Sequence, residues 1–221
     1  MPRSAFDRQL ETLNTELITM GALVETAIAG AAKALMEGDA GQARRIARSD
    51  AQTDDMEKRI ESLCLKLLLQ QQPVARDLRL ISAALKMITD MERIGDQAAD
   101  ISELTLLLGQ IKIPEVVQLI GDMARTTIHM VSSGVDAFVK KDLELAGAVI
   151  DMDDEVDALF VKIKETLTER IRSGGQWCEQ AIDLIMVAKY FERIGDHSVN
   201  IAEWVVFSIT GEHRLVGEAS E

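Results

Sequence analysis

The sequence predicts an all-α protein built from two tandem, repeated, antiparallel three-helix bundles, six long helices in total. Aromatic residues make up only 4% of the 221 residues, whereas 47% are hydrophobic and only three are proline. This composition favours long helices with continuous apolar seams over β-sheets. The pentapeptide Glu-Arg-Ile-Gly-Asp also occurs twice, at residues 92–96 and 192–196, which indicates an internal repeat.

Capping and turn residues delimit three helices in the first repeat, which we place at residues 1–110. Polar side chains and proline suit the first turn of a helix, and glycine suits its end. Asp39 followed by Gln42 also resembles a capping box. The predicted helices therefore run from Ser4 to Gly38, from Asp39 to about Gln71, and from Pro73 to Gly109.

The second repeat, at residues 114–210, restates the first with an offset of 103 residues that becomes 100 in its last helix. Asp142, for example, corresponds to Asp39. Short connections force neighbouring helices to lie antiparallel, and apolar seams that step by 3.5 residues predict left-handed crossing near 20°. The predicted helices run from Pro114 to Lys140, from Asp142 to Gly174–Gly175, and from there to Thr210, with a loose tail at residues 211–221.

Pairs of acidic residues lie inside these apolar seams. Glu92 and Asp96 are four residues apart, so both carboxylates project from one helix face, and Glu92 occupies a seam position between apolar residues. In an antiparallel pair that turns near Gln71, Asp50 reaches the same height as Glu92. The same reasoning applies to the second repeat. The predicted site residues are Asp50, Asp54, Glu92 and Asp96 in the first repeat and Asp153, Asp157, Glu192 and Asp196 in the second, with Asp100, Asn200, Glu103 and Glu203 as further ligands or supporting residues.

Four carboxylates at one level predict a metal site. Neither set contains His or Cys, so the oxygen donors favour Mg²⁺, Mn²⁺, Ca²⁺ or ferric iron, and zinc is less suited. Gly95 and Gly195 lie between the acids of their pairs, where a mid-helix glycine costs about 1 kcal/mol relative to alanine. Either a backbone or an ion approaches there, or the helices pack tightly.

The alternative is a buried salt-bridge network, with Arg93, Arg193, Arg76 or Arg79 as the counter-charge. Arg93 and Arg193 turn about 100° from their neighbouring glutamates on a helix, which weakens that reading. His197 also turns off the carboxylate face and is predicted to lie on the surface. Cys64 and Cys178 stand far apart without a partner motif and are predicted to be reduced core thiols.

The formal net charge of −13 restricts the partners. No basic run compensates for this charge, so nucleic acid and anionic lipid surfaces are repelled, and proteins or cations are the expected partners. We find no signal peptide and no apolar run of about 18 residues, and we therefore expect no transmembrane segment.

The chain resembles the PhoU family over nearly its whole length. The residues that carry the resemblance are Gln-Gln-Pro-Val-Ala-Arg-Asp-Leu-Arg at 71–79, the two Glu-Arg-Ile-Gly-Asp copies, and the acidic pairs that begin at Asp50 and Asp153. The second repeat has Ser-Gly-Gly-Gln in place of the Gln-Gln-Pro signature, and Asn200 stands where the first repeat has Asp100.

This resemblance implies a cytoplasmic regulator that restrains phosphate uptake and holds multinuclear metal clusters, of iron, manganese or magnesium, on the eight acidic residues. It also implies two partners, the ATPase of the phosphate ABC transporter (PstB-like) and the phosphate sensor histidine kinase (PhoR-like). Membrane association would be peripheral, through these partners, and we expect a homodimer.

Two functions other than a non-enzymatic adaptor are compatible with acidic pairs in a helical bundle. A carboxylate-bridged di-iron or di-manganese oxidase generally uses a Glu-x-x-His pair. None occurs, because His129, His197 and His213 follow Thr126, Ile194 and Thr210 at that spacing. The remaining alternative is a structural protein that oligomerises and binds no metal.

Overall fold

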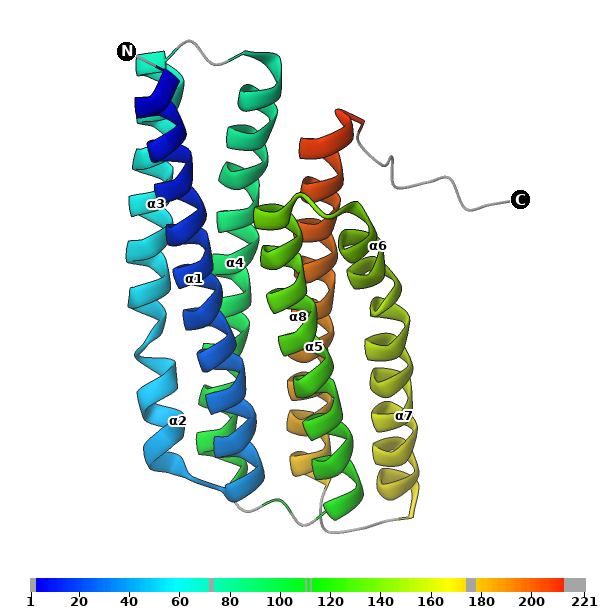
Figure 1. The fold of residues 1–221 in the computed structure, drawn as a ribbon. Coiled ribbons are helices and arrows are strands. Elements are labelled where there is room, and N and C mark those ends of the chain that lie inside the picture. The colour runs from blue at the N-terminus through cyan, green and yellow to red at the C-terminus, as the bar shows by residue number, and fades with distance from the viewer. Residues whose placement is uncertain (1–2, 72–73, 110, 112, 174–177, 213–221) are drawn as a thin grey trace, which may run out of the picture.

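The computed structural model describes residues 3–71, 74–109, 111, 113–173 and 178–212. All regular structure within this part of the chain is helical (Figure 1). The helices are α1 (Arg3–Glu37), α2 (Ala40–Ala47), α3 (Asp50–Gln71), α4 (Ala75–Leu108), α5 (Pro114–Lys140), α6 (Leu143–Asp151), α7 (Asp153–Arg172) and α8 (Cys178–Thr210).

The helices stand side by side in one elongated bundle, with α1, α3 and α4 on one side and α5, α7 and α8 on the other (Figure 1). The most extensive helix contact is between α4 and α8, which belong to different repeats. These two helices are antiparallel: Gln180 Nε2 donates to the carbonyl of Leu108 at 3.2 Å, and Asn200 Nδ2 donates to Asp90 at 3.0 Å. One hydrophobic core therefore runs through both repeats.

The second and fifth predicted helices are each divided in two, whereas the sequence predicts one continuous helix in both places. Between α2 and α3, the backbone N–H of Ser49 bonds to the Ile46 carbonyl at 2.9 Å, and its hydroxyl donates to the same oxygen at 2.7 Å. In the second repeat, Met152 both ends α6 and precedes α7. The breaks make Asp50 and Asp153 the first residues of new helices, where the partial positive charge of a helix N-terminus favours carboxylates.

Most predicted helix ends are confirmed. Gly38 and Gly109 end α1 and α4 with φ of 66° and 61°, which glycine adopts without strain. Pro114 is the first residue of α5. The Asp142 carboxylate accepts a hydrogen bond from the Leu145 N–H at 3.0 Å and caps α6.

Two capping predictions fail in part. Helix α1 begins at Arg3, before the predicted cap Ser4. Asp39 does accept hydrogen bonds from two backbone N–H groups at 2.8 and 2.9 Å. The Gln42 side chain, however, donates to the Gly30 carbonyl at 3.1 Å, so it does not complete a capping box. The predicted boundaries at Pro73 and Gly174–Gly175, and the tail beyond residue 212, lie outside the described residues.

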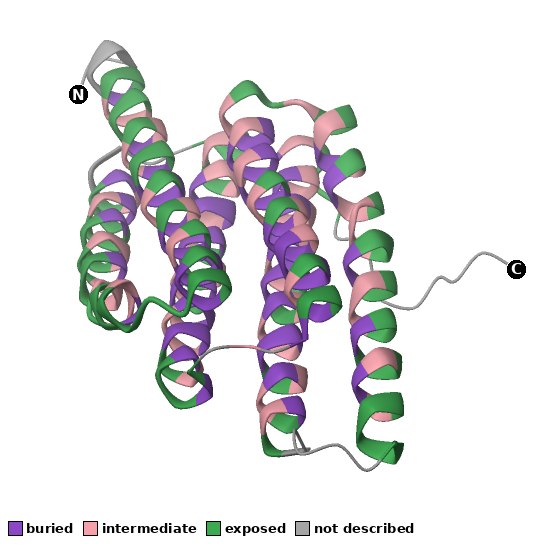
Figure 2. Ribbon diagram, turned by 90° about the horizontal axis from the view of Figure 1, so that it is seen from below, coloured by how far each residue is buried: buried purple, intermediate pink, exposed green. Residues whose placement is uncertain are grey.

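The core lies along the inward faces of all the long helices (Figure 2). One stretch, Phe6–Glu37 in α1, is long and apolar enough to cross a membrane, although we expected no such run. In the folded chain 56% of its most apolar window is buried. Helix α1 packs against α3, α4 and α5, which accounts for its composition as a core helix.

The glycine at the centre of the first repeated pentapeptide is predicted to be intolerant of large side chains. A Cβ built on Gly95 would lie 3.2 Å from Thr53 Cγ2, so α3 and α4 approach closely here. We expect Gly95→Leu to lower the free energy of unfolding by about 1–3 kcal/mol through overpacking. Urea denaturation measures this change. The matched control is Gly147→Leu, where a Cβ meets nothing within 4 Å, and equal losses in both variants would contradict the close approach.

Candidate metal centre

Two acidic clusters lie at equivalent positions in the two repeats. The first acidic cluster is Asp50, Asp54, Glu92 and Asp96, between α3 and α4, and the second acidic cluster is Asp153, Asp157, Glu192 and Asp196, between α7 and α8.

The first acidic cluster is assembled by the close contact between Gly95 and Thr53, because Thr53 lies on α3 between Asp50 and Asp54. Burial raises the pKa of Asp50, and the nearby carboxylates of Asp96, Asp54 and Asp100 raise it further. Burial and then Asp96 likewise raise the pKa of Glu92. The structure therefore brings the four predicted residues near one another and places Asp100, a predicted further ligand, beside them.

In the second acidic cluster, the Asp153 side chain packs directly against the backbone of Gly195. A Cβ on Gly195 would lie 3.1 Å from Asp153 Oδ1, so the carboxylate rests against the backbone of α8. Burial, followed by repulsion from Asp157, Asp196 and Glu192, raises the pKa of Asp153 to about 6. Asp157 and Asp196 are exposed to solvent, so this cluster is a partly open surface site and not the fully buried one that the seam position suggests.

The donor chemistry fits a hard cation. Asp50 Oδ1 and Asp153 Oδ1 are buried and have no hydrogen-bond partner among the described residues. Burying such an oxygen is costly unless a hydrogen bond, a proton or a cation satisfies it. The geometry is not preformed, because within the described residues no three His, Cys, Asp or Glu side chains stand close enough to hold one ion. Side-chain rotation is needed to close a coordination sphere.

Basic residues neutralise the clusters only in part. Arg93 pairs with Glu92 at 3.4 Å and with Asp96 at 3.1 Å, although the helix geometry had suggested that it points away. Lys189 pairs with Glu192. Within the described part of the chain, Asp50 and Asp153 form no ion pair, so the salt-bridge alternative accounts for one side of each cluster only.

The other arginines considered as counter-charges lie elsewhere. The Arg193 guanidinium lies over the Tyr190 ring, 5.9 Å from its centroid. Burial, and then the Glu103 carboxylate, raise the pKa of Asp100, and Arg193 opposes this rise only in part. Arg76 and Arg79 are near the start of α4, about 20 Å from Glu92 by helical rise.

Two residues beside the second acidic cluster turn toward α4 instead. Asn200 donates to Asp90, and His197 Nδ1 lies 2.9 Å from the same carboxylate oxygen. His197 is half-buried at the α4–α8 contact, so its predicted surface position is wrong. Asp90 was not predicted, because its counterpart in the second repeat is Tyr190 and no repeated pattern marks it.

The other predicted supporting residues lie at the edge of the clusters or outside them. Glu103 is exposed next to Asp100, and Glu203 is half-buried on α8. Cys64 is fully buried, and burial raises the pKa of its thiol to about 12, which confirms it as a core residue. The side chain of Cys178 lies outside the described residues.

Asp153→Asn is expected to stabilise the metal-free protein at neutral pH. The pKa of Asp153 is raised from 3.8 to about 6, so the folded state binds its proton more tightly than the unfolded state does. Stability is therefore lost as pH rises through this window and is not regained above it. After allowance for solvent screening, we expect a gain of about 1 kcal/mol, or about 2–4 °C in Tm, near pH 7.5 and little gain near pH 4.

Calorimetry in the presence of a chelator measures this difference, with Asp151→Asn, an exposed neighbour, as the control. An equal change in Tm at both pH values would contradict the electrostatic origin of the effect.

Comparison with known protein families finds the same domain twice in this chain. A family model described as "PhoU domain" matches residues 17–105 and 120–205. The chain is 36% identical to a phosphate-specific transport system accessory protein PhoU homolog from Clostridium acetobutylicum, covering 96% of this chain and 97% of that one. It is 33% identical to PhoU homolog 1 from Thermotoga maritima, covering 94% and 90%.

A solved structure supports the same relation. The crystal structure of PhoU from Pseudomonas aeruginosa superposes with a TM-score of 0.88 at 32% sequence identity, covering 94% of this chain and 100% of that chain. The two segments that the family model matches include the residues of both acidic clusters. On the evidence of its repeated sequence, its fold and these relatives, the chain belongs to the PhoU family.

Proposed function

We propose that this protein is a metal-binding, cytoplasmic regulator of phosphate uptake and phosphate-starvation signalling. The observation that carries the proposal is the fourfold occurrence of an acidic residue, three intervening residues and an aspartate, paired across α3–α4 and again across α7–α8. The names of the relatives, which describe accessory proteins of phosphate-specific transport, support the assignment to that system.

The residues that would hold metal are those of the two acidic clusters, with Asp100 beside the first. Their all-oxygen donor set suits iron, manganese or magnesium better than zinc, and bridging carboxylates would allow more than one ion per cluster. A bound cation would supply the counter-charge that no described basic residue gives to Asp50 and Asp153. The chain itself contributes the helix N-termini of α3 and α7, which favour the ionised aspartates at their first positions.

The proposed role is that of an adaptor and not of an enzyme. Its partners would be the ATPase of the phosphate ABC transporter and the sensor histidine kinase, which the chain would restrain when phosphate is plentiful. The net charge of −13 suits basic protein surfaces and disfavours nucleic acid. Association with the membrane would be peripheral, through these partners, and the working form would be a homodimer.

The test is deletion and replacement of the gene in its own organism, read out by a phosphate-repressed reporter and by phosphate uptake. Deletion should leave the reporter active in high phosphate, and the unaltered chain should silence it. A chain in which the four cluster aspartates of α3 and α7 are changed to asparagine should fail to silence it if metal regulates signalling; these are Asp50, Asp54, Asp153 and Asp157. A reporter that is unaffected by deletion would refute the regulatory role.

A further inference from the structure

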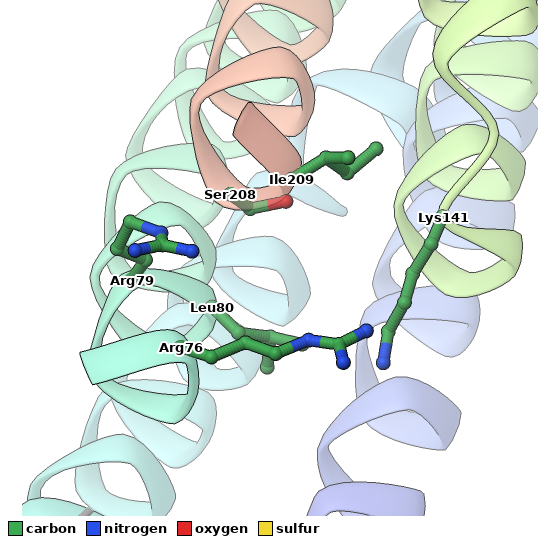
Figure 3. A pocket seen from close by; sticks show the side chains of 6 residues that line it. All are labelled: Arg76, Arg79, Leu80, Lys141, Ser208 and Ile209. Carbon is green, nitrogen blue, oxygen red and sulfur yellow. The ribbon is translucent and has the colours of Figure 1, made fainter. Parts of the chain in front are cut away.

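A cavity of about 380 Å³ lies where the start of α4 meets the ends of α5 and α8, apart from both acidic clusters (Figure 3). Two of its cationic residues come from α4, and a third follows α5 directly. Within the described part of the chain no acidic residue lines it. The lining residues are Arg76, Arg79, Leu80, Lys141, Ser208 and Ile209.

The three cations of this cavity have no acidic partner among the residues that the structure describes. None of them forms an ion pair with a described residue, although acidic residues outnumber basic ones by 37 to 24. Arg79 Nε is buried and has no hydrogen-bond partner in the described structure. Figure 3 shows the Arg76 guanidinium and the Lys141 ammonium pointing toward one another across the cavity. Like charges in this arrangement repel unless an anion lies between them.

The fold does not require these cations as helix caps. At the end of α5, the carbonyls of Phe138 and Ala137 already accept the backbone N–H groups of Lys141 and Asp142, at 3.3 and 2.9 Å. At the end of α8, the Phe207 carbonyl accepts the N–H of Gly211 at 2.8 Å. The C-terminal carbonyls that a basic side chain commonly satisfies are therefore occupied.

The symmetry-equivalent junction, where the start of α8 meets the ends of α1 and α4, does not have the basic residues at two of these positions. Glu179 stands at the position of Arg79, and Gly38 stands at the position of Lys141. Gly38 and Lys141 both have left-handed backbones, with φ of 66° and 57°. A residue other than glycine pays about 1 kcal/mol for this conformation. The backbone conformation at Lys141 favours glycine, so a ligand for the ammonium group accounts better for the presence of lysine at this position.

We propose that this cavity binds a multiply charged oxyanion of the phosphate class, held by Arg76, Arg79 and Lys141. Guanidinium groups match the oxygens of phosphate in pairs, and the ammonium adds a point charge. Helix α4 begins at Ala75 without a side-chain cap, so its first N–H groups and its dipole add to the attraction. The volume accommodates inorganic phosphate with water, or a pyrophosphate group.

Isothermal titration calorimetry of the full chain at low salt tests this proposal, with a chelator present so that metal at the acidic clusters cannot recruit phosphate. The ligands are inorganic phosphate, pyrophosphate, sulfate and citrate, and the first two distinguish a free phosphate from a phosphoanhydride. Arg76→Gln combined with Lys141→Gln should weaken binding by at least about 10-fold. The control, Arg59→Gln with Lys140→Gln, removes the same charge from exposed ion pairs and should change affinity by less than about twofold.

Two further measurements separate direct binding from general effects. Arg79→Lys keeps the positive charge but removes the planar guanidinium group that can donate two parallel hydrogen bonds to phosphate, so it should also weaken phosphate binding. Circular dichroism checks that each variant remains folded. Glu92→Ala with Asp96→Ala should leave phosphate binding intact, which makes the result independent of the proposed metal-dependent function. Absence of binding to the unaltered chain at millimolar phosphate, equal losses in the control variant, or tighter binding of citrate would overturn the proposal.

Discussion

Replacing Glu92 and Asp96 together by alanine is expected to remove the metal bound by the first acidic cluster and to leave the second acidic cluster loaded. These two residues are the cluster's metal ligands on α4, and the double variant retains only the two ligands on α3, Asp50 and Asp54. Because single supporting changes around metal sites already cost about 10–100-fold in affinity, loss of two direct ligands should empty the cluster. The total metal content should fall to about half if both clusters load equally.

Elemental analysis of protein purified without chelator or affinity metal measures this loss. The matched control is Glu165→Ala with Glu169→Ala, an exposed acidic pair at the same four-residue spacing on α7. If this control lost as much metal, the binding would be nonspecific. Loss of metal from both clusters in the Glu92 and Asp96 variant would show that the clusters are coupled. An unaltered metal content would remove the first acidic cluster from the proposal.

Ile60→Ala is expected to destabilise the whole protein and not the first repeat alone. Ile60 is fully buried on α3, and truncation of such a residue to alanine costs about 2–5 kcal/mol. The core is continuous between the repeats, and α4 and α8 make the most extensive helix contact. For a chain of this size, the loss corresponds to a Tm about 4–20 °C lower.

The two tryptophans allow a sharp test, because Trp177 and Trp204 both belong to the second repeat. Fluorescence therefore reports the second repeat and its contact with α4, where Lys86 Nζ lies 6.0 Å from the centroid of the Trp204 ring. Circular dichroism reports the helices of the whole chain. If the repeats unfold as one unit, Ile60→Ala should shift both midpoints equally. The control is Leu69→Ala on α3, which is 84% exposed and should shift neither midpoint measurably. A shift seen by circular dichroism alone would show that the repeats unfold independently.

The helices and the repeat could be predicted because they depend on neighbours in the sequence. The 3.5-residue seams, Gly38, Gly109, Pro114 and Asp142 act within one or two helical turns, and the structure confirms these ends. The breaks before Asp50 and Asp153 were missed, because the apolar seam continues through them and only the local bonds of Ser49 and Met152 mark them.

The approach of the acidic residues to one another was predictable from the sequence, but their surroundings were not. Spacing places Glu92 and Asp96 on one face, and antiparallel pairing brings them to Asp50, as the raised pKa of Asp50 reflects. Helical geometry did not reveal that the flexible side chain of Arg93 bends back to both acids. It also gave no reason to pair His197 with Asp90, which lies 107 residues away on another helix.

The sequence by itself determined the helical class, the two repeats and the eight acidic residues that face one another, because each follows from short-range periodicity repeated at a fixed offset. Only the tertiary structure decided that the repeats share one core, how far the acids are exposed, and that Arg76 and Arg79 meet Lys141 around one cavity. These features join side chains from helices far apart in the chain, and packing between helices, which no local pattern encodes, sets their positions.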